Sequence, residues 1–347
     1  MDKSYTLLTE KLRNNSGRCL WFIDESGESA LPLLAPFKSQ IAILTNRYNV
    51  WQTAKQLDIE CEFNDLDFGI FKPLQFDIAC LRVSKEKAIV HHTINQLFDK
   101  IKPQGTLYLS GAKSEGIKTY VDKCAKLFGD NAKAVKNGET YVAEIQLKNA
   151  SSSEFLDDSD YKEIRVIDQL DDHPIVSKPG VFGWNKIDQG SQMLVEEFLC
   201  YYHEKDRVYQ NYLDLGCGYG FLTLATHRLS LSTRTATDSN AAAILCMQEN
   251  AKNYRLDVSV IADDCGSNIN EQFDLILCNP PFHQGFDINN TLGKRFIEQS
   301  QRLLVQGGDA FFVVNSFIAI EALAKPYFTQ IETLANNKKF KVVRLSL

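Results

Sequence analysis

The stretch YLDLGCGYG, residues 212–220, decides the fold of this chain. Asp214 stands among apolar residues, and three glycines follow it at alternating positions: Gly216, Gly218 and Gly220. Glycine reaches backbone conformations with positive φ and lets the main chain approach a ligand closely, so the pattern predicts a buried strand, a tight turn and a helix start. Elements of this kind bind several nucleotide-like ligands, dinucleotides among them. Other residues must therefore identify the ligand.

Length and composition limit the kind of protein. A chain of 347 residues exceeds one small core, so we expect two domains. The net charge of −6 argues against binding nucleic acid by overall charge, although a local basic face remains compatible with it. The nine cysteines show neither a CxxC pair nor a Cys/His cluster, so no metal site or disulfide framework is expected. No long apolar run or signal peptide is present, which predicts a cytoplasmic protein without a membrane segment; the sequence gives no oligomeric state.

Short apolar runs alternate with helical patterns in the first 150 residues. The strand-like runs are CLWFID (19–24), IAILT (41–45), FDIACLRV (76–83) and TLYLSG (106–111), and helical patterns cover 49–57 and 86–101. Such alternation predicts a parallel α/β sheet. The run YVAEIQL (141–147) is expected to close this half as an edge strand.

A second α/β series follows the glycine-rich stretch. Strands are expected at 234–238, 258–263, 273–279 and 309–315, helices at 241–253 and 291–304, and a hairpin turn at Asn336-Asn337. The fold class is therefore α/β, with two tandem Rossmann-like domains.

The segment between the two series is strongly acidic. Residues 151–174 hold eight acids against two bases, which favours a solvated linker or edge strand over an acidic interaction site. We therefore expect a first domain over 1–150, a linker over 151–178 and a second domain over 179–347.

The two halves echo each other, as a duplicated α/β unit would. Asp77 in FDIACLRV corresponds to Asp274 in FDLILCNP, and Gly105 corresponds to Gly307 or Gly308. At the glycine turn the first half reads LWFIDESGESA and retains only Gly27. Where the second half has NPPF (279–282), the first half has VSKE (83–86). If one half is active, it is the second.

Acidic residues follow the next two strands of the second half. Asp238 lies 18 residues after Gly220, where nucleotide-binding α/β folds place an acid that accepts from both ribose hydroxyls; a strand-end cap is the alternative. Asp263 and Asp264 close the following strand, where an acid could reach an adenine amino group. Asp264 is the preferred residue, and a helix N-cap is the alternative for this pair.

The tetrapeptide Asn279, Pro280, Pro281, Phe282 follows the fourth strand. Prolines cannot continue a strand ladder, so the backbone carbonyls of Asn279 and Pro280 are left to point into the crevice; an ordinary proline turn is the alternative. An exocyclic amine is a poor nucleophile because its lone pair is conjugated with the ring. The Asn279 side-chain carbonyl and the Pro280 carbonyl can each accept one of its N–H groups, which frees the lone pair. Phe282 can stack on an extruded base, worth roughly 1–3 kcal/mol.

Together these motifs resemble the class I S-adenosylmethionine-dependent methyltransferases that modify exocyclic or planar amide nitrogens. A nicotinamide dehydrogenase would need GxGxxG and would leave NPPF unexplained. The resemblance implies catalysis by Asn279, Pro280, Pro281 and Phe282. It also implies S-adenosylmethionine binding by Asp214, Gly216, Cys217, Gly218, Gly220, Asp238, Asp263, Asp264 and Asn279.

A narrower resemblance rests on PGVFGWNKIDQGSQ (179–192), on NPPFH and on the duplicated layout. Over essentially the whole chain the sequence looks like the bacterial guanine-N2 methyltransferases of small-subunit ribosomal RNA, the methyltransferase C family. This implies 16S rRNA as substrate, within the small ribosomal subunit, and substrate contacts by Phe182, Asp188, Gln192 and His283. Gly183 departs from the serine expected after PGVF, which puts one local loop contact in doubt.

Other functions remain open alongside this one. The large-subunit guanine-N2 enzyme has a similar layout, and methyltransferases of DNA adenine or of protein glutamine share the tetrapeptide. A non-catalytic RNA-binding assembly factor is the alternative from another class, although the intact glycines and Asn279 argue against it.

A basic stretch lies in the first half. Residues 82–136 hold eleven bases against five acids in a chain that is acidic overall. The candidates for phosphate contacts are Lys85, Lys87, Lys100, Lys102, Lys113, Lys118, Lys123, Lys126 and Lys133. A solvated set of helix faces is the alternative. We expect the first domain to have lost cofactor binding and to act as an RNA-docking and stabilising partner.

Overall fold

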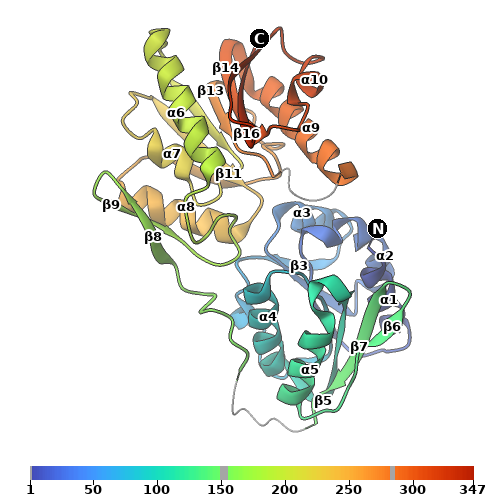
Figure 1. The fold of residues 1–347 in the computed structure, drawn as a ribbon. Coiled ribbons are helices and arrows are strands. Elements are labelled where there is room, and N and C mark those ends of the chain that lie inside the picture. Colours follow the sequence, from blue (N-terminus) through green and yellow to red (C-terminus); the bar gives the residue numbers. More distant parts are fainter. Residues whose placement is uncertain (1, 149–154, 282–285) are drawn as a thin grey trace. The chain divides into compact units, whose positions relative to one another are not determined.

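The structure, a computed structural model, describes residues 2–148, 155–281 and 286–347. The chain divides into two compact units, the first ending at Glu163 and the second beginning at Ile164 (Figure 1). Each unit is a seven-stranded sheet with helices on both faces. In the described part of the chain, no helix is both long and apolar enough to cross a membrane.

The first sheet has the strand order β3-β2-β1-β4-β5-β7-β6. Its strands are β1 (Cys19–Phe22), β2 (Ile41–Thr45), β3 (Glu60–Phe63), β4 (Phe76–Arg82), β5 (Ile101–Ala112), β6 (Val135–Asn137) and β7 (Thr140–Gln146). Strands β1 to β5 are parallel, whereas β7 runs antiparallel to both β5 and β6. The prediction that β7 forms the sheet edge is wrong, because the short strand β6 pairs with its outer side.

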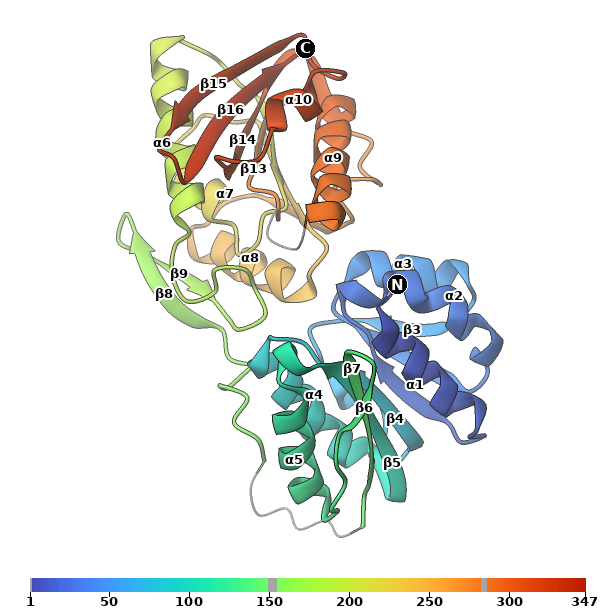
Figure 2. The ribbon, with the colours of Figure 1, turned by 45° about the vertical axis from the view of Figure 1, so that its right-hand side comes forward.

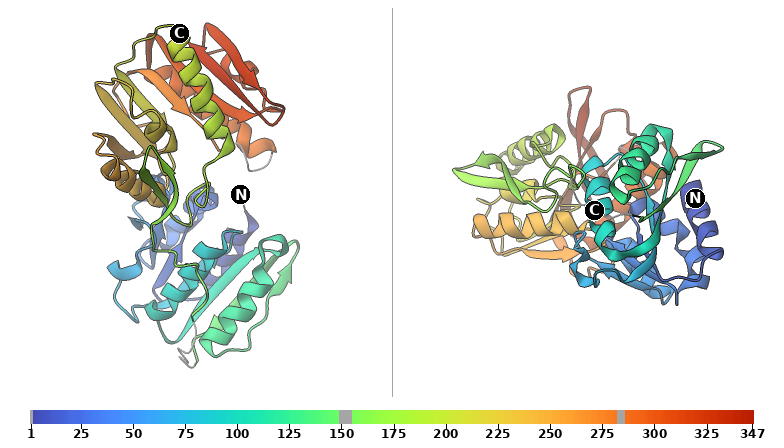
Figure 3. Two further views of the ribbon diagram at one scale, coloured as in Figure 1. Left: turned by 60° about the vertical axis from the view of Figure 1, so that its left-hand side comes forward. Right: turned by 90° about the horizontal axis from the view of Figure 1, so that it is seen from below.

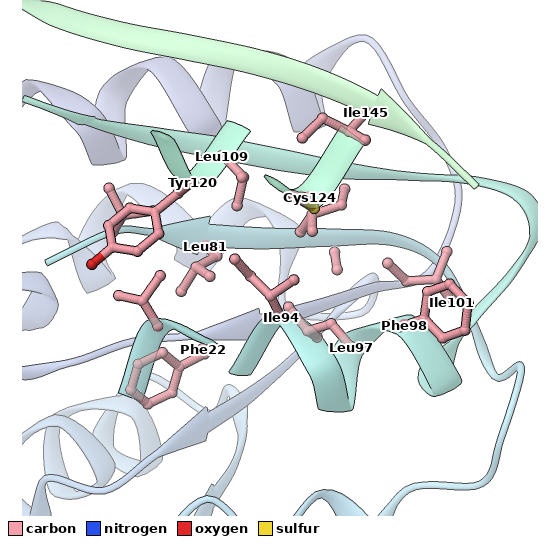
Figure 4. Close-up of a cluster of buried hydrophobic side chains, with 14 of the residues drawn as sticks. Phe22, Leu81, Ile94, Leu97, Phe98, Ile101, Leu109, Tyr120, Cys124 and Ile145 are labelled. Atoms are coloured by element: carbon pink, nitrogen blue, oxygen red, sulfur yellow. The ribbon is translucent and has the colours of Figure 1, made fainter. Parts of the chain in front are cut away.

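Helices cover both faces of this first sheet. They are α1 (Lys3–Arg13), α2 (Leu31–Leu34) and α3 (Tyr48–Gln56) on one face and α4 (Lys87–Lys100) and α5 (Ile117–Phe128) on the other, with 3₁₀ turns at Glu25–Ala30, Ala35–Phe37, Phe68–Ile70 and Lys113–Glu115. Figure 4 shows Ile94 and Leu97 of α4 packed with Leu81 and Leu109 of the sheet, and all four side chains are fully buried. Their removal from water is the main driving force for folding.

The second sheet repeats this order as β12-β11-β10-β13-β14-β16-β15. Its strands are β10 (Asn211–Leu215), β11 (Thr233–Asp238), β12 (Ser259–Ala262), β13 (Phe273–Cys278), β14 (Leu304–Asn315), β15 (Gln330–Asn336) and β16 (Phe340–Ser346). The pairing of β15 with β16 confirms the predicted hairpin. The predicted α/β class with two tandem Rossmann-like domains is also confirmed.

The helices of the second unit lie on opposite faces of its sheet (Figure 2). One face carries α6 (Gln189–Glu204), α7 (Phe221–Ala225) and α8 (Ala241–Asn253); the other carries α9 (Phe286–Leu303) and α10 (Ile320–Ala324). Alternate residues of β13 serve the two faces, Leu275 and Leu277 packing on the first and Ile276 and Cys278 on the second. Helix α9 begins five residues before the predicted start at Thr291.

A separate hairpin belongs to the second unit. Its strands β8 (Arg165–Leu170) and β9 (His173–Ser177) run beside α8 (Figures 1 and 3). The buried Asn250 side chain of α8 accepts a hydrogen bond from the backbone N–H of Val176 and donates to the carbonyls of Val176 and Tyr219, at 2.7–2.8 Å. One amide therefore ties this hairpin to the glycine turn.

The preceding residues, 155–163, pack on the first unit. The side chain of Asn95 in α4 donates to the carbonyl of Leu156 and accepts from its N–H, at 2.8 and 2.9 Å. Tyr161 is fully buried, and its hydroxyl donates to Asp65 Oδ1 at 2.7 Å. The described part of the acidic segment is therefore divided between the two units, and the boundary along the chain falls between Glu163 and Ile164.

The two units share local details as well as strand order. Asp77 accepts from the N–H of Arg18, ahead of β1, and Asp274 accepts from those of Gln210 and Asn211 at the start of β10, all at 2.8–3.0 Å. Each acid therefore caps the backbone that enters the central strand of its own sheet. This common arrangement supports duplication of one ancestral unit.

Glycine positions settle how the halves correspond. A Cβ added at Gly105 would lie 2.8 Å from the Asp77 carbonyl, and one at Gly308 would lie 3.1 Å from the Asp274 carbonyl. Gly105 therefore corresponds to Gly308, since at both positions the backbone passes close to the carbonyl of the matched acid.

Candidate active site

The glycine turn follows β10 directly. Gly216, Gly218 and Gly220 have φ of 80°, 56° and 95°, a region that favours glycine. A Cβ on Gly220 would lie 2.0 Å from Met247 Sδ, so this glycine is needed for packing against α8. A Cβ on Gly218 would have no protein atom within 4 Å, so the backbone there is open to a ligand.

Backbone hydrogen bonds hold the turn against the neighbouring strand. The N–H groups of Gly216 and Cys217 both donate to the carbonyl of Thr237, each at 2.9 Å. The Cys217 side chain is buried, and burial raises the pKa of its thiol well above the usual value. Its contribution to the site is therefore the backbone and not a reactive thiolate.

Asp214 lies fully buried beneath this turn. Its Oδ2 accepts from the Thr223 hydroxyl at 2.7 Å and from the Thr223 N–H at 3.2 Å. Its Oδ1 has no hydrogen-bond partner among the described residues. Burial raises the pKa of Asp214 to about 7, and the nearby charge of Asp238 adds to the effect. An unsatisfied buried acceptor is costly, so this carboxylate suits a positively charged ligand.

Asp238 meets the glycine turn, as the sequence predicts for a ribose-binding acid. Its Oδ2 accepts from the N–H of Gly218 and its Oδ1 from that of Asn240, both at 2.9 Å. A carboxylate oxygen has two acceptor positions, so one oxygen can accept from a hydroxyl as well as from an N–H group. Asn240 also donates from its side chain to the Gly180 carbonyl at 2.7 Å, which ties the PGVF turn to the site.

Asp263 and Asp264 have different environments. Asp263 is 1% exposed and accepts from the N–H groups of Asp264 and Asn268 and from the Asn268 side chain, so it caps its own loop. Asp264 lies partly exposed and pairs with Arg295 of α9. Their contact with an adenine amino group stays a prediction.

Asn279 follows β13, and its side-chain amide is held by the start of α6. Its Nδ2 donates to Asp188 Oδ2 at 3.0 Å and to Ser191 Oγ at 2.8 Å. Because a carboxylate only accepts, the amide nitrogen must face Asp188 and the carbonyl oxygen must face away. Asp188 is also the N-cap of α6 and accepts from the Ser191 N–H at 2.8 Å. The helix start therefore fixes the orientation of this amide.

A small cleft opens beside Asn279 at the carboxyl edge of the sheet. It is lined by Asp188, Asn279, Pro280, Val313, Val314, Asn315 and Phe340. Pro280 lies within its wall, and Pro281 is exposed. Phe282 and His283 lie outside the described residues.

The other predicted substrate residues are more scattered. Phe182 is 58% exposed, in the turn that Asn240 holds, and Gln192 is exposed on the first turn of α6. Gln192 lines a second cleft that lies between this turn and the tip of the β15–β16 hairpin.

The predicted lysines belong to the first unit. Lys85 is exposed, and Lys87 lies 3.0 Å from Asp157 through its Nζ. Lys100 is only 6% exposed, and Lys102 lies 2.7 Å from Asp77. Because Lys100 is buried, it is not available to contact phosphate. Lys102 pairs with Asp77, the acid that caps the start of β1.

Strand registers identify what replaces the site in the first unit. In the first unit, Trp21 of β1 pairs with Cys80 of β4, and in the second, Asp214 of β10 pairs with Leu277 of β13. Cys80 and Leu277 each lie three residues after the matched acids Asp77 and Asp274, so Trp21 corresponds to Asp214. Arg82 follows Cys80 by two residues, as Asn279 follows Leu277, so Arg82 and not Val83 corresponds to Asn279. The predicted match of VSKE (83–86) with NPPF (279–282) is therefore wrong by one residue.

Side chains of the first unit fill the equivalent place. The Arg82 guanidinium lies 2.8 Å from Asp2 and 2.5 Å from Glu115. Tyr5 of α1 donates its hydroxyl to Asp24 at 3.0 Å and stacks on Trp21. The first unit therefore has protein side chains where the second has its glycine turn and cleft.

Two proteins with sequences similar to this chain have the same name. "Ribosomal RNA small subunit methyltransferase C" of Actinobacillus pleuropneumoniae serotype 7 is 27% identical over 86% of this chain and 88% of its own length. The protein of the same name from Hamiltonella defensa is 28% identical over 93% of both chains.

A solved structure shares the fold over both units. The 16S rRNA N2 G1207 methyltransferase (RsmC) of T. thermophilus, in complex with AdoMet and guanosine, superposes with a TM-score of 0.84 at 22% identity. The match covers 99% of this chain and 92% of that one.

Two family models match successive parts of the sequence. The methyltransferase small domain matches residues 172–344, which include the glycine turn, Asp238 and Asn279, and the methyltransferase small domain N-terminal matches residues 12–150. Between them they account for nearly the whole chain, and the chain belongs to the methyltransferase small domain family.

Proposed function

We propose that this chain transfers a methyl group from S-adenosylmethionine to the exocyclic N2 of one guanine in 16S rRNA. The single observation that carries the proposal is the amide of Asn279, whose nitrogen is fixed on Asp188 and Ser191 so that its carbonyl remains to accept. The names of the relatives and of the similar structure agree with this substrate.

The residues of the second unit fit the cofactor. S-adenosylmethionine, when bound, supplies an electrophilic methyl group on a positively charged sulfur. Asp214 and Asp238 give the turn a negative field that suits this cation, and Asp238 would accept from the ribose hydroxyls. The open backbone at Gly218 allows close approach.

Asn279 and Pro280 would prepare the nucleophile. The side-chain carbonyl of Asn279 and the backbone carbonyl of Pro280 each accept one N–H of the guanine amino group, which draws the nitrogen towards tetrahedral geometry. These two contacts would orient the lone pair for attack on an electrophile. The proton would become acidic only after methyl transfer and could then pass to solvent water, so no strong base is required. Phe282, which lies outside the described residues, would stack on the extruded guanine.

The first unit would serve as a docking and stabilising partner. Its former site is filled by Arg82, Asp2 and Glu115, while exposed lysines such as Lys85 remain to meet phosphates. The substrate is the rRNA within the small ribosomal subunit, and the protein works in the cytoplasm. We propose the boundaries 1–150 for the degenerate domain, 151–178 for the connecting segment and 179–347 for the catalytic domain. Within the connecting segment, residues 155–163 pack on the first unit and residues 164–178 belong to the second.

An in vitro methylation assay tests the proposal. Small subunits, free 16S rRNA and large subunits, all from cells lacking this enzyme, are incubated with S-adenosylmethionine labelled in its methyl group. We expect label in one guanine N2 of the small-subunit rRNA and none with Asn279→Ala. Label only in large-subunit rRNA would favour the large-subunit alternative, and no label in any RNA would favour the non-catalytic assembly factor.

A further inference from the structure

We propose that Phe317 is a stacking platform for a nucleotide that neighbours the target guanine in single-stranded RNA. The proposal rests on the proposed function and extends it to a second nucleotide. Phe317 follows β14 by two residues and is 72% exposed. It comes two residues after Asn315, which lines the same cleft as Asn279.

Phe317 stands on a rim whose parts are fastened to one another. The N–H of Ser316 donates to the Lys339 carbonyl and its hydroxyl to Asn336 Oδ1, both at 3.0 Å. Lys339 Nζ donates to Gln189 Oε1 at 2.6 Å. Gln189 is the neighbour of Asp188, which holds Asn279. A connected path therefore fixes the backbone beside Phe317 relative to the amide that would hold the target base.

The hairpin tip that supports this rim is itself rigid. Asn337 Oδ1 accepts from the N–H groups of Lys339 and Phe340, and Asn336 Oδ1 accepts from that of Lys338, at 2.7–3.0 Å. A side chain presented from such a support loses little conformational freedom when it binds. Preorganisation of this kind favours affinity because less ordering is needed on association.

An exposed phenylalanine at this place matches what base extrusion requires. Drawing the target guanine into the cleft removes the stacking partner of the next base, which costs a few kcal/mol. An aromatic ring can replace that partner without reading the identity of the base, since every base has a π-face. The exposed Lys338 on the adjoining hairpin tip supplies a positive charge for the same strand's phosphates.

A matched set of variants tests this platform on RNA oligonucleotides that span the methylated guanine, once mass mapping has located it. Phe317→Ala should raise KM for the RNA about 5- to 150-fold, the range for one base–aromatic stack, and leave S-adenosylmethionine affinity unchanged. Phe317→Trp should restore the affinity. Phe317→Leu keeps apolar bulk without the ring and should not restore it.

RNA substrates that lack one base test the stacking contact independently. Removing the base on one side of the target should weaken binding to the wild type and have little further effect on Phe317→Ala, because the two changes remove the same contact. Full activity of Phe317→Ala, full rescue by leucine, or equal abasic effects in both proteins would overturn the platform. Absence of methyl transfer by the wild type would instead contradict the proposed function itself.

Discussion

The two units share a sheet topology and differ in the residues at the carboxyl edge of the sheet. Both have the same order of seven strands, and in both an acid caps the entry to the central strand, Asp77 in the first and Asp274 in the second. At the carboxyl edge, however, Arg82 occupies the position of Asn279, and Trp21 that of Asp214. Residues that satisfy backbone groups were kept, and residues that suit a ligand were replaced.

The free-energy cost of buried polar groups without partners explains this difference. An unpaired backbone N–H ahead of the central strand would destabilise either unit, so both retain the acid. A buried carboxylate such as Asp214 raises the free energy of the folded state unless a cation compensates its charge. A unit that binds no ligand would keep this destabilisation. Trp21 buries apolar area at that position instead.

The largest expected effect comes from the matched positions Asn279 and Arg82. Asn279→Ala removes one preorganised acceptor and should lower kcat by roughly 10²–10³-fold, as loss of one such hydrogen-bonding group does in other enzymes. Affinity for S-adenosylmethionine, measured by calorimetry, should change much less. Retained activity of this variant would refute the mechanism.

Arg82→Ala should lower the stability of the first unit and leave kcat unchanged. The change leaves Asp2 and Glu115 without their cation and should lower the unfolding free energy of the first unit by about 1.5–3 kcal/mol, the range for hydrogen bonds to charged groups. Denaturant unfolding and kcat are both measured. A fall in kcat of the kind seen for Asn279→Ala, with stability unchanged, would mean that the first unit takes part in catalysis.

Asp238 and its counterpart Thr45 test whether only the second unit binds the cofactor. Both end the second strand of their units, β11 and β2. Asp238→Ala removes a charged acceptor and should weaken S-adenosylmethionine about 10- to 100-fold in calorimetry, whereas Thr45→Ala should leave it unchanged. Stoichiometry should be one cofactor per chain; a second site lost with Thr45→Ala would contradict the degenerate first unit.

Asp214 predicts a pH dependence that Trp21 cannot give. The pKa of Asp214 rises from 3.8 to about 7 on folding, so the folded state holds the proton more tightly. Its contribution to stability is therefore full below pH 3.8 and is lost as pH rises through 7. Asp214→Asn should gain stability relative to the wild type between those pH values, measured by denaturant unfolding.

The same ionisation should govern cofactor affinity. A cation binds the charged form of Asp214, so affinity should rise up to tenfold per pH unit below 7 and level off above it. Asp214→Asn should flatten this profile in calorimetry. A wild-type profile that is already flat would show that the carboxylate does not face the cation.

The smallest effect is expected from the exposed lysines of the first unit. Lys85→Glu with Lys87→Glu should weaken RNA binding and reduce the slope of log affinity against log salt by about 0.7 for each lost single-strand phosphate contact. Lys11→Glu with Lys38→Glu, at two first-unit lysines that are not among the candidate phosphate contacts, is the matched control. An unchanged slope with an intact fold would remove the docking role from this surface.

Most helices, strands and turns could be predicted from the sequence because they depend on local patterns. The glycine turn, the strand runs and the final hairpin follow from backbone conformation and alternating burial. The edge position of β7 was wrong because β6 has only three residues, all exposed, and gives no apolar signal. Strand order across each sheet is set by packing between distant segments, which local patterns do not contain.

The site was less predictable where distant residues meet. Ser191 holds Asn279 from 88 positions away, and no local spacing indicates that contact. Thr223 was also missed, although its place three residues after Gly220, in the first turn of α7, is a signal for a residue that meets Asp214. Lys100 was misjudged because charge alone does not reveal that its helix face is buried.

The central claim is that Asn279 of the second unit prepares a guanine N2 for methylation while the matched Arg82 does not. Mass mapping of 16S rRNA from a deletion strain, complemented with the wild type, Asn279→Ala or Arg82→Ala, tests it most directly. We predict that one N2-methylguanosine is lost on deletion, restored by the wild type and by Arg82→Ala, and not restored by Asn279→Ala. Restoration by Asn279→Ala, or an unchanged methylation pattern in the deletion strain, would contradict the account.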